Sequence, residues 1–285
     1  MDNRTAQRFS CADFTFPLLA HDKVLALLHL LEFEGVDVGV FTGRSHIQPK
    51  DVVENPKAAA SQLLASLQAT GLRVSDVFLQ TGLDPASESV NDPDPAVRKR
   101  VRHVFERVLQ FGEALGSRHM TGLPGVRHQA ISENDCLSLA AEEATWRAET
   151  AKRAGVTYAI EAHLGSICPD PQSALRFLEL AEGVTLTLDY GHFVAVGIAN
   201  EAVHCLLPFA SHFHARGGCP GKLQASANDN TIAFEAIVKW LRSSSYNGYI
   251  CLEYVWVDWR DCNRTDNLSE TLLLREHLKT LCERA

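Results

Sequence analysis

Short apolar segments alternate with longer amphipathic segments along almost the whole chain. The apolar segments are rich in Val, Ile, Phe and Tyr, as buried strands are. In chain order they are RFSCADF, GVDVGVF, RVSDVFLQ, SRHMTGL, VTYAIEAH, VTLTLDY, FASHFHA and GYICLEYV. The amphipathic segments predict helices over residues 22–33, 55–71, 94–116, 132–155, 170 onwards, 200–208, 231–243 and 267–283.

Several of these helices begin with a clear start signal. Asn55-Pro56, Asp94-Pro95 and Asp170-Pro171 each place a capping side chain directly before a proline, which the first helical turn tolerates. Eight strands alternating with eight helices in about 250 residues predict a single (β/α)8 TIM barrel, with residues 1–285 as one domain. A doubly wound open sheet is the alternative, but it usually carries a Gly-rich phosphate loop that this sequence lacks.

Acidic residues and a histidine stand at the ends of the last four predicted strands. These residues are Glu161, Asp189, His214 and Glu253, and the intervals between them are 28, 25 and 39 residues. One strand–helix unit of a barrel takes about 31 residues, so the four side chains are expected at one level of the barrel mouth. Three converging carboxylates repel one another unless a cation neutralises them. The oxygen-rich, thiolate-free set suits Mn²⁺ best, with Mg²⁺ or Co²⁺ as alternatives.

Further polar residues near these strand ends are candidates for binding a substrate. The strand FASHFHA alternates so that His212, His214 and Arg216 point to the same side. The loop ARGGCPGKLQ places Arg216, Lys222 and Gln224 where they could bind a carboxylate or phosphate, although Lys222 could equally lie in a solvated loop. His163 either orients a ligand or bonds to a backbone carbonyl, and the same alternatives hold for His212.

Two more groups of residues are expected near the barrel mouth. Arg44 and His46 follow the second strand, where contact with the substrate is one interpretation. Trp256 and Trp259 follow the eighth strand and either wall a pocket or pack against neighbouring helices.

The segments IEAHLGS, LDYGHF, HFHARG and CLEYVW resemble the four metal-binding strand ends of the xylose isomerase-like TIM barrel superfamily, over roughly residues 155–260. Its members include sugar and sugar-phosphate isomerases, ketose 3-epimerases, hydroxypyruvate isomerases, inosose dehydratases and a DNA-repair nuclease branch. The resemblance implies that Glu161, Asp189, His214 and Glu253 are metal ligands and that His192 touches the substrate. Family epimerases often carry a second acid where this chain has Ile167, and they place their arginine farther along the loop than Arg216.

The expected function is that of a metal-dependent isomerase or epimerase of a small sugar, sugar phosphate or sugar acid. The metal would act as a Lewis acid that stabilises an enediolate. Glu161 and Glu253, on opposite sides of the metal, would carry out the proton transfers. The alternative is a lyase, a decarboxylase or dehydratase of an oxo sugar acid, which the basic loop around Arg216 favours. A repair nuclease and a non-catalytic sugar-binding barrel fit less well.

Charge and cysteine content narrow the expected partners and compartment. The net charge of −8 and the absence of a Lys/Arg run argue against nucleic acid, and a small polyhydroxylated carbonyl compound, neutral or anionic, is the expected partner. Eight cysteines without a C-x-x-C pair are expected as reduced thiols in a cytoplasmic protein. The sequence has no signal-peptide pattern at its start and no apolar run of about 18 residues, so no membrane contact is expected. The sequence is compatible with a homo-oligomer as well as with a monomer.

Overall fold

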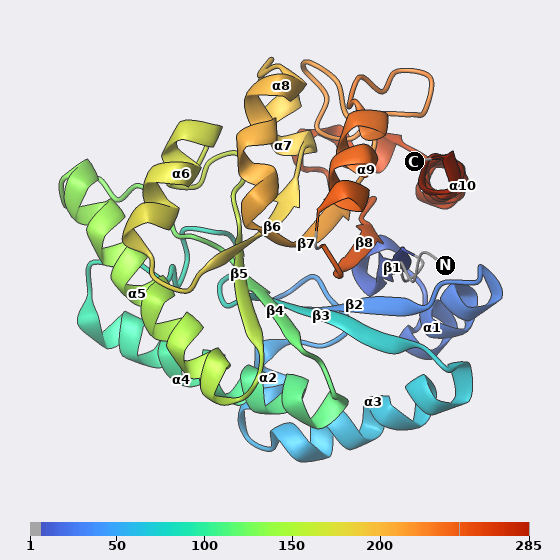
Figure 1. Ribbon diagram of the computed structural model, residues 1–285. Coiled ribbons are helices and arrows are strands. Elements are labelled where there is room, and N and C mark those ends of the chain that lie inside the picture. The colour runs from blue at the N-terminus through green and yellow to red at the C-terminus, as the bar shows by residue number, and fades with distance from the viewer. Residues whose placement is uncertain (1–6, 245, 285) are drawn as a thin grey trace.

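Eight parallel strands close into one barrel in chain order in the computed structural model, which describes residues 7–244 and 246–284 (Figure 1). Residues 1–6, 245 and 285 of the expected domain lie outside the described part of the chain. The strands are β1 (Arg8–Ala12), β2 (Gly35–Phe41), β3 (Arg73–Gln80), β4 (His119–Gly122), β5 (Thr157–Glu161), β6 (Thr185–Asp189), β7 (Ala210–Ala215) and β8 (Tyr249–Leu252). Each lies within a predicted segment, and the pairing of β1 with β8 completes the ring. The predicted (β/α)8 barrel is confirmed.

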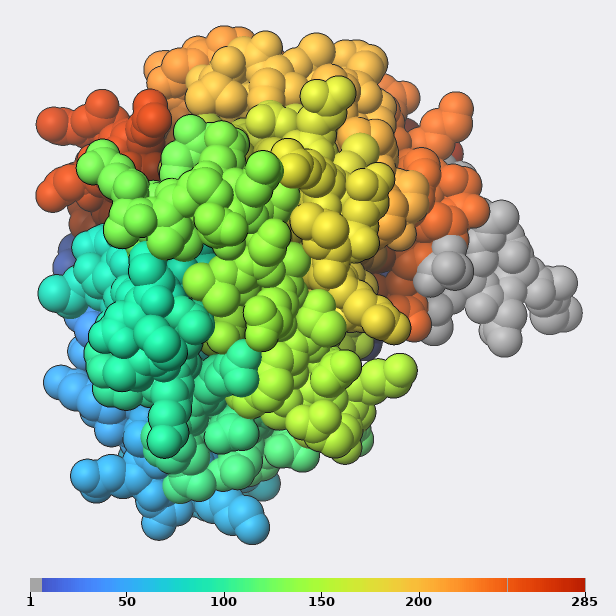
Figure 2. Space-filling model, turned by 90° about the vertical axis from the view of Figure 1, so that its left-hand side faces the viewer, coloured from blue at the N-terminus to red at the C-terminus, as the bar shows by residue number. Residues whose placement is uncertain are grey.

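The helices lie outside the ring of strands (Figure 1). They are α1 (His21–Leu30), α2 (Pro49–Val53), α3 (Pro56–Thr70), α4 (Pro95–Leu115), α5 (Glu133–Arg153), α6 (Pro171–Leu180), α7 (Gly191–Val194), α8 (Asn200–Val203), α9 (Phe234–Ser243) and α10 (Asn267–Arg284). Figure 2 shows one outer face, where α4, α5 and α6 lie side by side and cover the strands behind them.

The predicted capping residues act as caps. The side chains of Asn55 and Asp170 accept hydrogen bonds from backbone N–H groups three residues on, at 3.1 and 2.9 Å. Asp94 accepts from the N–H two residues on at 2.8 Å. One predicted helix is wrong in kind: residues 200–208 form the short α8 followed by a 3₁₀-helix over His204–Phe209. Pro208 within that segment has no N–H to donate, so a regular α-helix does not continue through it.

The barrel has an apolar outside and a partly polar inside. Apolar strand residues such as Val38 and Ile160 pack against the helices and are fully buried. Inside, polar groups bond to one another: Thr121 on β4 pairs with Thr187 on β6 at 2.6 Å, and Asp76 on β3 pairs with His119 on β4 at 2.6 Å. Because a buried polar group needs a partner, the interior is held by fixed hydrogen bonds as well as by packing. This network leads up to the carboxyl ends of the strands.

Two further expectations concern the chain as a whole. All eight cysteines lie in the described residues and are free thiols, as expected. Among the described residues, none of the helices combines the length and the apolar character needed to span a membrane.

Candidate metal and active site

Glu161, Asp189, His214 and Glu253 lie at the carboxyl ends of four neighbouring strands. Glu161 and Asp189 are the last residues of β5 and β6, His214 is the second last residue of β7, and Glu253 directly follows β8. Asp189 is the register partner of His214, and the N–H of Glu253 donates to the carbonyl of Ala215 at 3.0 Å. The register of the parallel strands, which shifts once between Leu186 and Thr187 of β6, brings the four side chains to one level.

His214 forms the centre of this group. Its Nδ1 lies 2.7 Å from Oε1 of Glu161 and 3.6 Å from Oε2 of Glu253. One ligand atom from each of these three residues fits within 4.8 Å of the others, close enough to share one ion. All three side chains are buried, with at most 5% of each residue exposed, so their charges interact with little screening by water.

Asp189 joins the group through His192. Nε2 of His192 lies 3.6 Å from Asp189 Oδ2 and 3.8 Å from Glu161 Oε2. The N–H of Gly191 donates to Asp189 Oδ1 at 2.7 Å. A Cβ at Gly191 would lie 2.9 Å from that same oxygen and 3.1 Å from the carbonyl of Leu223, so only glycine leaves room for the carboxylate in the segment LDYGH.

The guanidinium of Arg216 lies among the same carboxylates. Its Nη2 forms an ion pair with Asp189 and lies 3.4 Å from Glu253 Oε2 and 3.1 Å from His192 Nε2. Arg216 is 3% exposed. The alternation predicted for β7 therefore holds, because His212, His214 and Arg216 all point into the barrel. The side chain of Arg216 lines the site with its charge already partly compensated by Asp189.

The two glutamates on either side of His214 have different proton affinities. Burial alone would raise the pKa of Glu161, but its hydrogen bond to His214 and the charge of His214 lower the pKa to about 2. Burial raises the pKa of Glu253 to about 7, although His214 and Arg216 oppose this shift. Burial also lowers the pKa of His192 to about 4. Two carboxyl groups with separated pKa values are the usual arrangement for a site that both removes and returns protons.

A divalent cation fits this group of residues. Glu253 Oε2 is buried and makes no hydrogen bond within the described part of the chain, so a strong acceptor at the centre of the group is left unsatisfied. Three carboxylates and one imidazole are the donors that Mn²⁺ and Mg²⁺ accept in proteins. Glu161, Asp189, His214 and Glu253 could therefore hold such an ion with donors of the expected kind.

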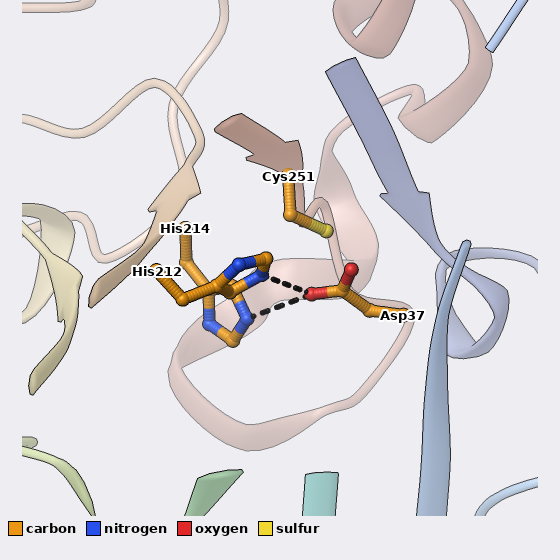
Figure 3. Close-up of side chains that lie close together, drawn as sticks. All are labelled: Asp37, His212, His214 and Cys251. Carbon is orange, nitrogen blue, oxygen red and sulfur yellow. Dashed lines mark hydrogen bonds and ion pairs between the residues drawn. The ribbon is translucent and has the colours of Figure 1, made fainter. Parts of the chain in front are cut away.

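A second cluster, Asp37, His212, His214 and Cys251, lies behind the first and is also compact enough for one ion (Figure 3). Asp37 Oδ2 is hydrogen-bonded to Nε2 of His212 at 2.6 Å, and Nε2 of His214 lies 3.3 Å from the same oxygen. Burial and the charge of Asp37 raise the pKa of the Cys251 thiol well above its usual range. Because Asp37 contacts both imidazoles, the cluster also supports His214 from inside the barrel.

A cavity of about 680 Å³ opens above the first cluster. Its polar lining includes Arg44, Gln80, His163, His192 and Arg216 next to Glu161 and Glu253, and its apolar lining includes Phe14, Phe41, Phe78, Val255 and Trp259. Nδ1 of His163 bonds to the carbonyl of Leu164 at 2.9 Å, while its Nε2 is buried without a partner among the described residues. The cavity can hold a small molecule that presents polar groups on one side and C–H groups on the other.

Another cavity, of about 850 Å³, lies at the opposite end of the barrel. It is lined by residues at the amino ends of the strands, among them Arg8, Arg73 and His119. Although it is larger, it lies away from the clustered carboxylates. In barrels of this architecture the reacting groups lie at the carboxyl ends of the strands, so the smaller cavity is the candidate active site.

A sequence profile described as xylose isomerase-like TIM barrel matches residues 25–281. The chain belongs to this family. A search of curated proteins finds no match to the sequence. The profile match extends the resemblance seen in residues 155–260 to nearly the whole chain.

Solved structures with the same fold include several sugar epimerases. A D-psicose 3-epimerase from Clostridium cellulolyticum H10, crystallised with D-tagatose, is 15% identical, with 97% of this chain and 99% of that chain covered and a TM-score of 0.76. An L-ribulose 3-epimerase is 20% identical, with 98% and 95% covered and a TM-score of 0.74. A probable 3-DHS dehydratase from Bacillus anthracis is 12% identical, with 94% and 99% covered and a TM-score of 0.69. At these identities the likeness establishes the fold.

Two residues predicted to bind substrate have other partners in this member of the xylose isomerase-like family. Lys222 is exposed and pairs with Asp229 at 2.8 Å. It therefore lies in a solvated loop, which was the alternative to a role in binding substrate. The side-chain amide of Gln224 donates to the carbonyls of Val255 and Cys262 at 3.2 and 2.7 Å. The side chain of Gln224 therefore holds the segment after β8 in place. Neither Lys222 nor Gln224 lines the cavity.

Other predicted residues are divided between the cavity and its surroundings. Arg44 and Trp259 line the main cavity, whereas His46 and Trp256 line a neighbouring cavity of about 370 Å³. Asp37 was not predicted as a part of the site. Its signal in the sequence is a single charged residue inside the otherwise apolar strand GVDVGVF, which is costly to bury without a partner.

Proposed function

We propose that this protein is a divalent-metal-dependent isomerase or epimerase of a small sugar, sugar phosphate or sugar acid. The observation that carries the proposal is the pair of buried carboxyl groups, Glu161 and Glu253, on either side of His214 at 2.7 and 3.6 Å. Both carboxyl groups line the cavity, so each could exchange a proton with a molecule bound there.

In the proposed reaction the two glutamates divide the proton transfers. One carboxylate removes the hydrogen from the carbon next to the carbonyl, and the other carboxyl group returns a proton to the opposite face or to the neighbouring carbon. His192, buried between Asp189 and the cavity, and His163, with its free Nε2, are placed to bond to substrate hydroxyl groups. The aromatic rings of Phe41, Phe78 and Trp259 line the same cavity and offer an apolar surface to the C–H groups of a substrate.

Glu161, Asp189, His214 and Glu253 would hold the metal ion, with Mn²⁺ the preferred occupant and Mg²⁺ or Co²⁺ as alternatives. When bound, a divalent cation supplies Lewis-acid stabilisation of the negative charge that develops on a substrate oxygen. Asp37 would keep the imidazole of His214 in place from behind, with Nδ1 directed towards Glu161 and Glu253. Sugar epimerases of the same fold, such as the D-psicose and L-ribulose 3-epimerases, support this substrate class.

The proposal is tested by exchange of substrate hydrogen with deuterated water. A panel of ketoses and the corresponding oxo acids is incubated with the protein, first after removal of metal by a chelator and then with Mn²⁺ added. Exchange at the carbon next to the carbonyl should require Mn²⁺ and should accompany product formation. Exchange that is equally fast in metal-free protein, or a panel on which the Mn²⁺-loaded protein catalyses no exchange, would count against the proposal.

Variants of the two glutamates separate the two transfers. Glu161→Gln and Glu253→Gln should each lose about 10²- to 10⁴-fold in turnover at saturating Mn²⁺, because a general acid–base group is removed. One variant should still exchange the hydrogen without forming product, and the other should do neither. Glu235→Gln, which changes an exposed glutamate of α9, is the matched control and should keep full activity. If both site variants regain normal turnover at high Mn²⁺, the glutamates are ligands only.

A lyase acting on an oxo sugar acid is the second candidate. The observation that favours it is the number of arginines on the cavity wall, since Arg44, Arg127, Arg216 and Arg260 all line it. A dehydratase from Bacillus anthracis shares the fold. Measuring released carbon dioxide, or an unsaturated product, alongside the deuterium exchange distinguishes the two reactions.

A further inference from the structure

Arg44 lies on the wall of the candidate active site, just beyond the end of β2. Its Nη2 donates to Oε1 of Gln80 at 2.6 Å, and its guanidinium carbon lies 4.5 Å from the centroid of the Phe41 ring. Gln80 is itself held by a bond from its amide nitrogen to the carbonyl of Gly82 at 3.1 Å. The guanidinium is therefore fixed in position against the cavity.

Arg44 differs from the other cations of the cavity in its partners. Arg216 pairs with Asp189, and Arg127 pairs with Glu133. Arg260 is exposed, as Arg44 is, but its guanidinium lies against the Trp259 ring and makes no side-chain hydrogen bond among the described residues that would hold it in place. The part of the chain that the structure describes gives Arg44 no carboxylate within 4.0 Å, so its charge faces the cavity with one neutral hydrogen-bond partner.

The surroundings of Arg44 make an anionic partner favourable. Arg44 as a whole residue is exposed, but the cavity wall partly shields its guanidinium, and this shielding lowers the pKa of the guanidinium. The carboxylates of Glu253 and Glu161 oppose that shift, so Arg44 lies in the same electrostatic field as the predicted metal ligands. A cation that is partly removed from water regains stability when a charged acceptor binds to it. The planar guanidinium offers two parallel N–H donors to a carboxylate or a phosphate.

We infer that Arg44 binds an oxyanion group, a carboxylate or a phosphate, carried by the substrate at the end away from the metal ligands. The inference rests on the proposed function for the position of the reacting carbonyl. It assigns the role of anion recognition to Arg44, whereas Arg216, the residue expected for it from sequence, is already paired with Asp189 inside the barrel. The site is thereby specific for sugar acids or sugar phosphates over neutral sugars.

The test uses binding of unreactive probes to metal-free protein, so that it does not depend on turnover. D-ribonate, D-ribitol 5-phosphate and the neutral polyol ribitol are titrated separately, and dissociation constants are measured by ligand-observed NMR. Metal is left out because a bound cation would itself attract the anionic probes. At least one of the two anions should bind on the order of 10- to 100-fold more tightly than ribitol, the range for a hydrogen bond to a charged group. Which anion binds more tightly separates a carboxylate from a phosphate substrate.

Variants of Arg44 decide whether this residue is responsible. In Arg44→Gln the preferred anion should bind no more tightly than ribitol, and Arg44→Lys should keep part of the preference because it keeps the charge but loses the two parallel donors. Lys222→Gln removes a positive charge outside the cavity and should leave the preference unchanged. Thermal unfolding of each variant confirms that it is folded.

Two results would overturn the inference. One is wild-type protein that shows no preference for either anion over ribitol, including no detectable binding of the anions. The other is Arg44→Gln protein that keeps the full preference. Neither result bears on whether the protein needs a metal, which the deuterium-exchange experiment measures separately.

Discussion

Replacing Asp37 by Asn would remove the carboxylate that supports His214 from inside the barrel. Oδ1 of Asp37 accepts a hydrogen bond from Ser10 at 2.9 Å and another from Ser75. Oδ2 is hydrogen-bonded to His212 at 2.6 Å and lies 3.3 Å from Nε2 of His214 (Figure 3). An asparagine side chain has one acceptor oxygen and an amide that only donates. With the asparagine oxygen facing Ser10 and Ser75, His212 would lose its acceptor, and the negative charge facing the two imidazoles would disappear.

The size of the effect follows from the burial of the network. Asp37 is 0% exposed and both histidines are 1% exposed, so water cannot replace the lost acceptor. Loss of the hydrogen bond between His212 and the carboxylate costs about 1.5–3 kcal/mol. The substitution also removes the charge that faces the buried imidazole of His214, so the total loss of stability should be about 3–5 kcal/mol, as is typical when one partner of a buried ion pair is removed. Because Asp37 also orients a predicted metal ligand, Mn²⁺ affinity should fall about 10- to 100-fold.

A matched control is present in the same barrel. Asp76 is also 0% exposed, and it pairs with His119 at 2.6 Å nearer the amino ends of the strands. Asp76→Asn therefore breaks a carboxylate–histidine pair of the same kind without touching the predicted ligands. It should destabilise the protein, while Mn²⁺ affinity should stay within about twofold of the wild type, since the binding free energy is unchanged.

The assay has two parts, denaturant unfolding of metal-free protein and titration of the folded variants with Mn²⁺. The reasoning is refuted if Asp37→Asn binds Mn²⁺ as tightly as the wild type. It is also refuted if Asp76→Asn loses as much affinity as Asp37→Asn, because the effect would then reflect general loosening of the barrel. If Asp37→Asn is too unstable to titrate, Asp37→Glu keeps the charge and should recover stability in part while still displacing His214.

Two further predictions concern stability. Arg147 is 2% exposed and pairs with Glu143 at 2.8 Å. Glu143→Gln should lower the free energy of unfolding by about 3–5 kcal/mol, because it leaves Arg147 as an uncompensated buried charge. A loss below about 1 kcal/mol, measured by denaturant unfolding, would mean that water reaches the guanidinium. Burial lowers the pKa of His119 below its ordinary value of 6.5 despite the nearby charge of Asp76. The unfolded chain therefore takes up a proton near pH 6.5 that the folded chain does not, so the contribution of His119 to stability is complete above that pH and declines as the pH falls below it. Unfolding measured between pH 8 and pH 5 should show a smaller loss in His119→Gln than in the wild type, and equal losses would contradict this.

The barrel could be predicted from sequence because its local signals agree with its global pattern. The strands GVDVGVF and RVSDVFLQ were placed at their observed bounds, since buried parallel strands form short apolar segments between polar loops. Helix starts at Pro56, Pro95 and Pro171 followed from the capping residue before each proline. The single helix predicted over residues 200–208 was wrong. The apolar spacing of this segment resembles that of a helix, but Pro208 lacks the N–H that a regular α-helix would need there.

The site could be predicted only as far as strand register determines it. Glu161, Asp189, His214 and Glu253 come together because parallel strands with regular connections place their last residues at one level. Loop residues have no such rule. Lys222 and Gln224 follow β7 closely in sequence, but the loop turns them towards solvent and towards the segment after β8. The support from Asp37 depends on a contact across the barrel between β2 and β7, 175 residues apart, which no local pattern encodes.

Direct detection of the ligands of bound Mn²⁺ tests the central claim most closely. Pulsed electron paramagnetic resonance of the Mn²⁺-loaded protein counts the nitrogen atoms bonded to the ion, and the same sample gives the number of ions per chain. The account predicts one ion per chain with one imidazole nitrogen, whose signal is lost in His214→Gln and kept in His212→Gln. Two nitrogen ligands that require both His212 and His214 would place the ion in the Asp37 cluster instead, and no bound Mn²⁺ would contradict a metal-dependent reaction at this site.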